Sequence, residues 1–125
     1  MAEHNELGKA GESAALAYLK EKDYQIRHIN WHWKHLELDI VAQTDDELVV
    51  VEVKTRSEAG WEMPEDAVTP IKMRRIISAA DCYVKYFQIQ LPVRFDIISI
   101  IGNFPNWEIQ HIEDAFFPSV QTYRR

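Results

Sequence analysis

Two charged residues, Glu52 and Lys54, lie inside residues 48–55, a run that is otherwise almost entirely apolar and rich in β-branched side chains. Such a run is typical of a strand that is buried on both faces, where an ionised side chain loses its stabilising water. Asp39 precedes them in a stretch that alternates apolar and polar residues. Carboxylate oxygens are the ligands that Mg²⁺ prefers, and a nearby lysine offsets negative charge. These three residues are therefore the first candidates for chemistry.

Residues 36–56 predict two strands that are joined by a short acidic turn. The apolar positions that give the first strand the period of a half-buried strand are Leu36, Leu38 and Ile40. Side chains two residues apart on a strand point to the same face, so Glu37 and Asp39 share one face. By the same rule, Glu52 and Lys54 share a face of the second strand.

The turn between the two strands predicts how they pair. A hairpin that closes with residues 45–46 at its turn places Thr44 opposite Glu47. Counting outward, the facing pairs of charged residues are Asp39 with Glu52 and Glu37 with Lys54. Opposed residues of antiparallel strands share a face, with Cβ atoms roughly 4.5–5.5 Å apart. The sequence thus predicts a patch of carboxylates and one ammonium group on a single face of the sheet.

Two opposed carboxylates repel each other by on the order of 4 kcal/mol at about 4 Å and an effective dielectric constant near 20. A shared proton or a bound cation relieves this repulsion, and a hard divalent metal held by Asp39 and Glu52 is one solution. The alternative is a structural cross-strand ladder, in which Glu37 pairs with Lys54 and Asp39 lies near solvent.

The order of Asp39 and the triplet Glu52-Val53-Lys54 resembles the PD-(D/E)xK signature of the restriction-endonuclease-like superfamily. An ordered set of motifs between residues 8 and 116 resembles the YraN family of uncharacterised bacterial proteins. These motifs are Gly8-x-x-Gly11-Glu12, Ala15, Tyr18-Leu19, Glu37-Leu38-Asp39-Ile40, Val51-Glu52-Val53-Lys54-Thr55-Arg56, Pro64-x-x-Ala67-Val68-Thr69, the cluster from Lys72 to Arg75, and Arg94-Phe95-Asp96. One departure is Leu36, where the family more often has Gly.

The resemblance implies a restriction-endonuclease-like core, Mg²⁺ or Mn²⁺ as the cofactor, and DNA, including branched DNA, as the substrate. It also implies kinship with archaeal-type Holliday-junction resolvases, which carry a similar helical glutamate ahead of the two strands. On this basis Glu12 acquires a role at the metal site or in positioning water, where spacing alone favours a solvated helix glutamate. Resolvase-like relatives also imply a homodimer.

We predict a metal-dependent endonuclease whose catalytic residues are Glu12, Asp39, Glu52 and Lys54. The predicted metal ligands are Asp39, Glu52 and the main-chain carbonyl of Val53. In this mechanism Lys54 orients or activates the attacking water, and Glu37 belongs to the outer shell. The candidate contacts to nucleic acid are Arg56, Lys72, Arg74 and Arg75. Two other classes stay open, namely a non-catalytic module that binds nucleic acid or protein, and a structural protein with ion-paired strands.

The remaining pattern predicts the elements that position these residues. A helix begins with Asn5 as its N-cap, and residues 24–33 form a strand with a bulge near His28. Residues 69–70 are an N-cap and first-turn pair for a long helix, whose basic first turns oppose the helix dipole. A phosphate partner would account for these cations, and an ordinary solvated face is the alternative.

Further elements complete an α/β fold with a mixed sheet of about five strands between the two helices. Pro64 begins a short helical turn, and residues 93–101 form a buried strand on which Arg94 and Asp96 share a face. The strand predicted last is short and includes Trp107 and His111.

Composition bounds the class of protein. The 125 residues are 46% hydrophobic and 27% charged, which predicts one globular domain over residues 1–125, with residues 118–125 as a loose tail. No apolar run approaches ~18 residues and no signal pattern is present, so we expect no membrane span and a cytoplasmic location. The net charge of −6 argues against a nucleic-acid coat protein but does not exclude a nuclease. A single cysteine, Cys82, excludes an internal disulfide.

Overall fold

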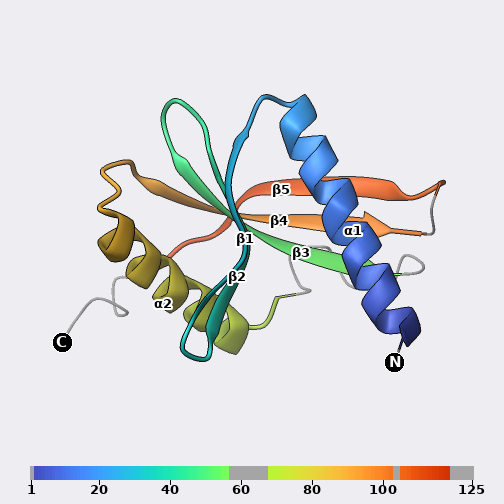
Figure 1. The fold of residues 1–125 in the computed structure, drawn as a ribbon, viewed down its shortest axis with the longest axis horizontal. Helices are drawn as coiled ribbons and strands as arrows, with labels where there is room; N and C mark the ends of the chain where they lie inside the picture. The colour runs from blue at the N-terminus through green and yellow to red at the C-terminus, as the bar shows by residue number, and fades with distance from the viewer. Residues whose placement is uncertain (1, 57–67, 103–104, 119–125) are drawn as a thin grey trace.

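The computed structural model describes residues 2–56, 68–102 and 105–118 of the chain. These residues form two helices and five strands (Figure 1). In chain order the elements are α1 (Ala2–Glu21), β1 (Gln25–Trp33), β2 (Leu36–Gln43), β3 (Leu48–Arg56), α2 (Pro70–Phe87), β4 (Val93–Ile101) and β5 (Glu108–Phe116). The predicted α/β fold is confirmed. None of the described helices combines the length and apolarity that crossing a lipid bilayer requires.

The five strands form one sheet in the order β1-β2-β3-β4-β5. β3 and β4 run parallel, whereas the other neighbouring strands are antiparallel, so the sheet is mixed, as predicted. Parallel neighbours cannot be joined by a tight hairpin and need a crossover connection. The connection from β3 to β4 contains α2. β3 therefore lies at the centre of the sheet, between its hairpin partner β2 and its parallel partner β4.

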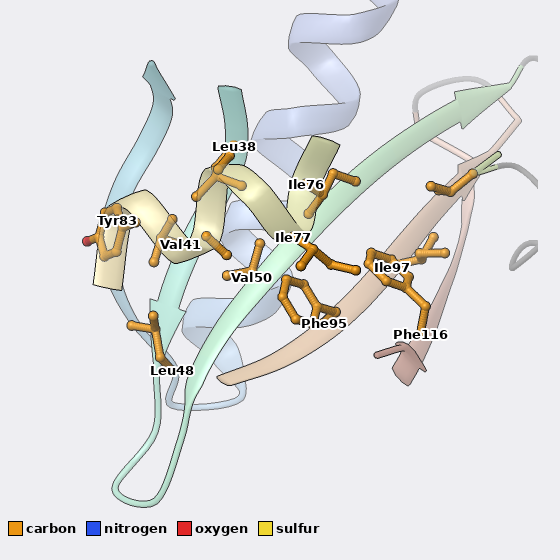
Figure 2. Packing of buried hydrophobic residues seen from close by; sticks show 13 residues of the cluster. Leu38, Val41, Leu48, Val50, Ile76, Ile77, Tyr83, Phe95, Ile97 and Phe116 are labelled. Carbon is orange, nitrogen blue, oxygen red and sulfur yellow. The ribbon is translucent and has the colours of Figure 1, made fainter. Parts of the chain in front are cut away.

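α1 and α2 pack on opposite faces of the sheet, each over its own hydrophobic cluster. Figure 2 shows Ile76, Ile77 and Tyr83 of α2 among side chains from the strands, such as Val50 and Phe95. The buried residues of the cluster under α1 are Ala15, Leu19, Ile40, Ala42, Val49, Val51, Ile98 and Ile100. Both faces of β3 are thus covered, which explains why its sequence is apolar without alternation.

The close approach of α1 to the sheet depends on Gly11. A Cβ atom added at Gly11 would overlap Cγ2 of Thr55 on β3, whereas one added at Gly8 would have nothing within 4 Å. The missing side chain at Gly11 lets the helix backbone approach β3. This approach brings Glu12, the next residue, to the same end of the sheet as the charged end of β3.

Several local predictions are confirmed. The register between β1 and β2 shifts between Ile26 and His28, at the predicted bulge. Thr69 caps α2, because its side-chain oxygen accepts a hydrogen bond of 3.2 Å from the backbone N–H of Lys72. Pro70 occupies the first turn, where its missing N–H costs nothing.

Two local predictions are wrong, and two segments lie outside the described residues. α1 begins at Ala2, so Asn5 is inside the helix and is not its N-cap. The strand predicted to be short is not, since β5 spans Glu108–Phe116, and it begins one residue after Trp107. The helical turn predicted at Pro64 and the tail over residues 119–125 fall outside the described ranges.

A buried polar network joins β4 to β5 and to Tyr24, which follows α1, and it confirms the predicted pair on β4. The Arg94 guanidinium donates to both carboxylate oxygens of Asp96, at 2.9 and 2.8 Å. It also donates to Tyr24 Oη at 2.7 Å and to Glu47 Oε1 at 3.0 Å. His111 Nε2 lies 2.7 Å from Asp96 Oδ2. Because Asp96 is fully buried, these contacts replace the water that its charge has lost.

Candidate functional site

The predicted hairpin register holds from the turn to the middle of the strands. Thr44 N donates to Glu47 O at 2.9 Å, and paired residues run from Gln43 with Leu48 to Ile40 with Val51. The same register, continued by one step, brings Asp39 to Glu52. Backbone pairing stops before that step, and β2 and β3 diverge beyond it (Figure 1). The charged residues therefore lie at the mouth of an opening between β2 and β3.

Asp39 marks a reversal in the direction of the side chains of β2. Leu38 packs in the cluster under α2, whereas Ile40, two residues later, packs in the cluster under α1. The prediction that Leu36, Leu38 and Ile40 share one face is therefore wrong. The neighbouring strand has an irregularity at the same level, because Asn30 of β1 adopts a left-handed backbone with φ of 51°. This local twist releases Asp39 from a regular strand position.

The released Asp39 side chain binds the backbone of β3. Its Oδ2 accepts a hydrogen bond of 3.0 Å from the N–H of Val53. The N–H and C=O of one strand residue point to the same side of the strand, so the Val53 carbonyl also faces the opening next to β2. The Asp39 carboxyl is at the same time close enough to the Glu52 carboxyl to share a hydrogen bond with it. The predicted juxtaposition of these two acids is confirmed.

The two carboxyl groups open into a polar cavity of about 440 Å³. The charged and amide side chains that line it are Lys9 and Glu12 from α1, Asn30 from β1, Asp39 from β2, Glu52 and Lys54 from β3, and Lys72 from α2. Val53 lines the cavity as well. Four predicted site residues from three elements thus meet in one hollow, namely Glu12, Asp39, Glu52 and Lys54.

The acids of this cavity hold their protons more tightly than free carboxylic acids. Burial and the neighbouring charge of Asp39 raise the pKa of Glu52 from 4.5 to about 7. Burial raises the pKa of Asp39, although the Val53 hydrogen bond and Lys72 act in the opposite direction. Near neutral pH the pair therefore retains a proton or requires a cation in its place.

Glu12 reaches the cavity from α1 and is held there by a residue that the sequence analysis did not identify. Asn30 Nδ2 donates a hydrogen bond of 2.9 Å to Glu12 Oε1. Burial raises the pKa of Glu12, the Asn30 hydrogen bond lowers it, and the charges of Asp39 and Glu37 raise it further. The signal for Asn30 was available, since a polar residue that tolerates a left-handed backbone interrupts a strand at this position.

Lys72 lies closer to the acid pair than its predicted role in nucleic-acid binding requires. Its Nζ is 3.4 Å from Glu52 Oε2, and its charge acts on both Asp39 and Glu52. The predicted cation, Lys54, lines the same cavity, but no ion pair among the described residues joins it to either acid. The long-range contact from the start of α2 was not predicted.

The predicted pairing of Glu37 with Lys54 is wrong. Glu37 is paired with His32 of β1, and the nearest atoms of the two side chains, Oε2 and Nε2, are 3.9 Å apart. Because β2 and β3 have separated at this level, the strand register no longer brings Glu37 to Lys54. Glu37 acts on the site at longer range, through the repulsion that raises the pKa of Asp39 and of Glu12.

The other basic candidates differ in their distance from the cavity. Arg75 lines a smaller adjoining hollow of about 50 Å³ together with His35, Glu37 and Lys72. Arg74, its neighbour on α2, is exposed and lines neither hollow. Arg56 ends β3, where its carbonyl accepts a hydrogen bond of 2.8 Å from the Gly102 N–H. The structure thus brings Lys72 beside the acid pair and Arg75 to the adjoining hollow, and it leaves Arg74 outside both.

The donors available for a metal are few and all are oxygens. Across the three described ranges, no three side chains of His, Cys, Asp or Glu gather closely enough to ligate one ion. The side-chain donors are therefore two, Asp39 and Glu52, and the Val53 carbonyl faces the same opening. Two carboxylates and a carbonyl, with room for water, fit the preference of Mg²⁺ for a few protein oxygens and several retained waters.

Comparison with known proteins gives one consistent result. Residues 11–100 match the model of the family described as "Uncharacterised protein family UPF0102". A UPF0102 protein of Bacteroides fragilis is 60% identical over 118 residues, which cover 94% of this chain and 98% of the relative. UPF0102 proteins of Parabacteroides distasonis and Phocaeicola vulgatus are 57% and 55% identical, and 94% and 96% of this chain align to 97% and 99% of theirs.

Proposed function

The chain belongs to the UPF0102 family, and from the site just described we propose that it is a metal-dependent endonuclease that cleaves DNA, including branched DNA. The observation that carries the proposal is the close pair of acids, the buried Glu52 and the half-buried Asp39, which opens into a polar cavity. Burial and the charge of Asp39 raise the pKa of Glu52 to about 7. A purely structural pair gains little from such repulsion. In a pair that binds a cation, the repulsion between the two carboxylates favours binding, because the cation relieves it.

Asp39, Glu52 and the Val53 carbonyl would hold Mg²⁺ or Mn²⁺. Such a metal, when bound, would lower the pKa of a water and offset negative charge on the scissile phosphate. The Val53 N–H has a part in this arrangement, since it fixes Asp39 Oδ2 and leaves the other carboxylate oxygen available to the cavity. Glu37 would remain in the outer shell, where its charge acts on Asp39 and Glu12 without contact with the metal.

Lys54 supplies a cation that is not neutralised by either acid. It lines the cavity on the strand that carries Glu52, two residues away and therefore on the same side of β3. An ammonium in that position orients the attacking water and stabilises the negative charge that develops on the phosphate. Glu12, held by Asn30, faces the same hollow and would accept a hydrogen bond from that water.

The proposed substrate class is supported by the site and by the cations around it. A phosphodiester carries the charge that Lys54, Lys72 and Arg75 can meet, and Arg56 and Arg74 would contact flanking phosphates. The overall charge of −6 does not oppose this, because two Mg²⁺ ions would change it formally to −2 (−6 + 4). A homodimer would present two such sites to the two strands of a branched substrate.

A second candidate is a nuclease-derived module that binds nucleic acid or protein without catalysis. The observation in its favour is that only two carboxylates cluster among the described residues, where many metal sites have three side-chain ligands. Calorimetry with Mn²⁺ on the wild type and on Asp39→Asn separates the two candidates. Heat of binding that disappears in Asp39→Asn supports the nuclease, and no heat in either protein supports the module.

The decisive experiment is a cleavage assay with Mg²⁺ or Mn²⁺ on linear, flapped and four-way DNA. We expect the wild type to cut at least one substrate, and Glu52→Gln and Lys54→Ala to lose that activity while keeping their circular-dichroism spectra. Lys85→Ala is the matched control, because Lys85 pairs with Asp81 on the exposed face of α2, away from the cavity. Cutting by Glu52→Gln or Lys54→Ala at the wild-type rate would reject the proposed roles.

A further inference from the structure

We infer that Lys72 is a displaceable stand-in for the metal: it holds Glu52 while the site is empty and moves to a phosphate of the DNA when the metal binds. The inference rests on the proposed function and adds a coupling between metal binding and DNA binding. Lys72 is thus assigned a regulatory role at the metal site, in addition to the contact with nucleic acid that the sequence predicts.

The position of Lys72 is not explained by helix stability. Its backbone N–H is bound by the Thr69 cap, so it lies in the first turn of α2, and that turn contains no acidic residue. A lysine there is repelled by the positive end of the helix dipole. Its favourable partner comes from another element, namely Glu52 of β3. The ammonium therefore serves the acid pair.

The contact between Lys72 and Glu52 has the geometry of a loose ion pair. The distance from Nζ to Oε2 is 3.4 Å, longer than the roughly 2.7–2.9 Å of a tight charge-assisted hydrogen bond. The two side chains also differ in burial, because 9% of the Glu52 side chain is exposed but 46% of the Lys72 side chain is. The acid is fixed in the sheet, and the lysine reaches it from solvent. Lys72 is therefore the partner that can leave.

A divalent cation held by Asp39 and Glu52 would lie next to the Lys72 ammonium and repel it. The metal also takes over the charge compensation that Lys72 provides to both acids. A place for the displaced side chain exists nearby, since Lys72 lines both the main cavity and the adjoining hollow with Arg75. A phosphate at that hollow would meet the two cations Lys72 and Arg75, against one carboxylate, Glu37. In this way metal binding adds one phosphate contact to the DNA-binding surface.

The first test is the affinity of DNA-free protein for Mn²⁺, measured by calorimetry. Lys72→Met removes the competing cation, so we expect it to bind Mn²⁺ about tenfold more tightly than the wild type, a coupling within the range usual for linked sites. Arg74→Met is the matched control, because it removes the same charge two positions further along α2, outside the cavity. We expect its Mn²⁺ affinity to stay within about twofold of the wild type.

The second test is the salt dependence of DNA affinity, measured with Ca²⁺ in place of Mg²⁺ and again with chelator. With chelator, the wild type and Lys72→Met should have equal slopes of log affinity against log salt, since Lys72 is occupied by Glu52. With Ca²⁺, the slope of the wild type should be steeper than that of Lys72→Met by about 0.9, the value for one additional contact to a duplex phosphate.

The outcomes separate this inference from the proposed function. If the wild type binds Mn²⁺ and cleaves DNA but Lys72→Met binds Mn²⁺ no more tightly, the stand-in role is rejected and the nuclease is retained. Equal salt slopes of the wild type and Lys72→Met in Ca²⁺ reject the stand-in role as well. If neither protein binds Mn²⁺, both the inference and the proposed function are overturned.

Discussion

The backbone N–H of Val53 donates a hydrogen bond of 3.0 Å to Oδ2 of Asp39, across the opening where β2 and β3 separate. A side-chain oxygen thus takes the place of the backbone carbonyl that a continuous hairpin would offer. The contact satisfies a strand N–H and at the same time holds one acid of the pair beside Glu52. The fold and the geometry of the site therefore both depend on Oδ2 of Asp39.

Asp39→Asn and Asp39→Ala should differ in their effect on stability. Asparagine retains an oxygen for the Val53 N–H and removes the charge that repels Glu52, so we expect Asp39→Asn to be at least as stable as the wild type at pH 8 without metal. Alanine leaves the N–H without an acceptor, which costs about 1–3 kcal/mol. Urea unfolding of the three proteins measures the difference. Equal stability of the two variants would contradict a structural role of this hydrogen bond.

Stability without metal should fall between pH 5 and pH 8 because of Glu52. Burial and the Asp39 charge raise its pKa from 4.5 to about 7, so the folded protein binds the proton more tightly than the unfolded chain does. The associated stabilisation is fully present below pH 4.5 and is lost as the pH rises through 7. Its size is on the order of 3 kcal/mol.

The control for this prediction is Glu52→Gln, which cannot titrate at position 52. Its urea-unfolding free energy should change much less than that of the wild type between pH 5 and pH 8 in chelating buffer. At pH 8 the variant should be the more stable protein. A parallel fall in both proteins would mean that other groups cause the pH dependence.

Gly8→Ala and Gly11→Ala should change the stability of the fold in opposite directions. Alanine is favoured over glycine inside a helix by about 1 kcal/mol, and at Gly8 the added Cβ meets nothing within 4 Å. At Gly11 the added Cβ overlaps Cγ2 of Thr55, which costs about 1–3 kcal/mol as overpacking. Thermal melts should show a gain for Gly8→Ala and a loss for Gly11→Ala. Adding Thr55→Ser, which removes Cγ2, should recover most of that loss.

Arg94→Met should be among the most destabilising substitutions. The side chain is 10% exposed, and its removal leaves the fully buried Asp96 without its bidentate partner. Breaking a buried ion pair in this way costs about 3–5 kcal/mol. The double variant Arg94→Met/Asp96→Leu should be more stable than the sum of the single changes, as a double-mutant cycle in urea would measure. An additive result would mean that the two side chains act independently.

Much of the fold follows from local patterns that the sequence displays. The apolar run of β3, the bulge before His28 and the cap at Thr69 each depend on neighbouring residues only. The register that brings Asp39 to Glu52 was predictable for a similar reason. A tight turn fixes the pairing of Thr44 with Glu47, and the side-chain period of two carries that pairing outward.

The prediction failed where distant elements decide the local geometry. The side chains of β2 change the face to which they point at Asp39, opposite a left-handed residue in β1, whereas periodicity alone would continue the alternation. Lys72 and Asn30 reach the site from α2 and β1, and their sequence neighbours do not show which acid they meet. The prediction of Asn5 as the N-cap is wrong because the helix begins earlier, at Ala2.

Asn30→Gly should alter Glu12 without disturbing the strand. The φ of 51° at Asn30 is a conformation that glycine adopts without strain, so the substitution removes the amide and keeps the backbone. The Asn30 hydrogen bond lowers the pKa of Glu12 against the raising effect of burial. Without it, the pKa of Glu12 should rise further. NMR titration of the side-chain carboxyl carbon, assigned with Glu12→Gln, should show its midpoint at higher pH in Asn30→Gly. The acidic limb of the pH–rate profile for DNA cleavage should move to higher pH as well. An unchanged midpoint in the NMR titration would show that Asn30 does not control the pKa of Glu12.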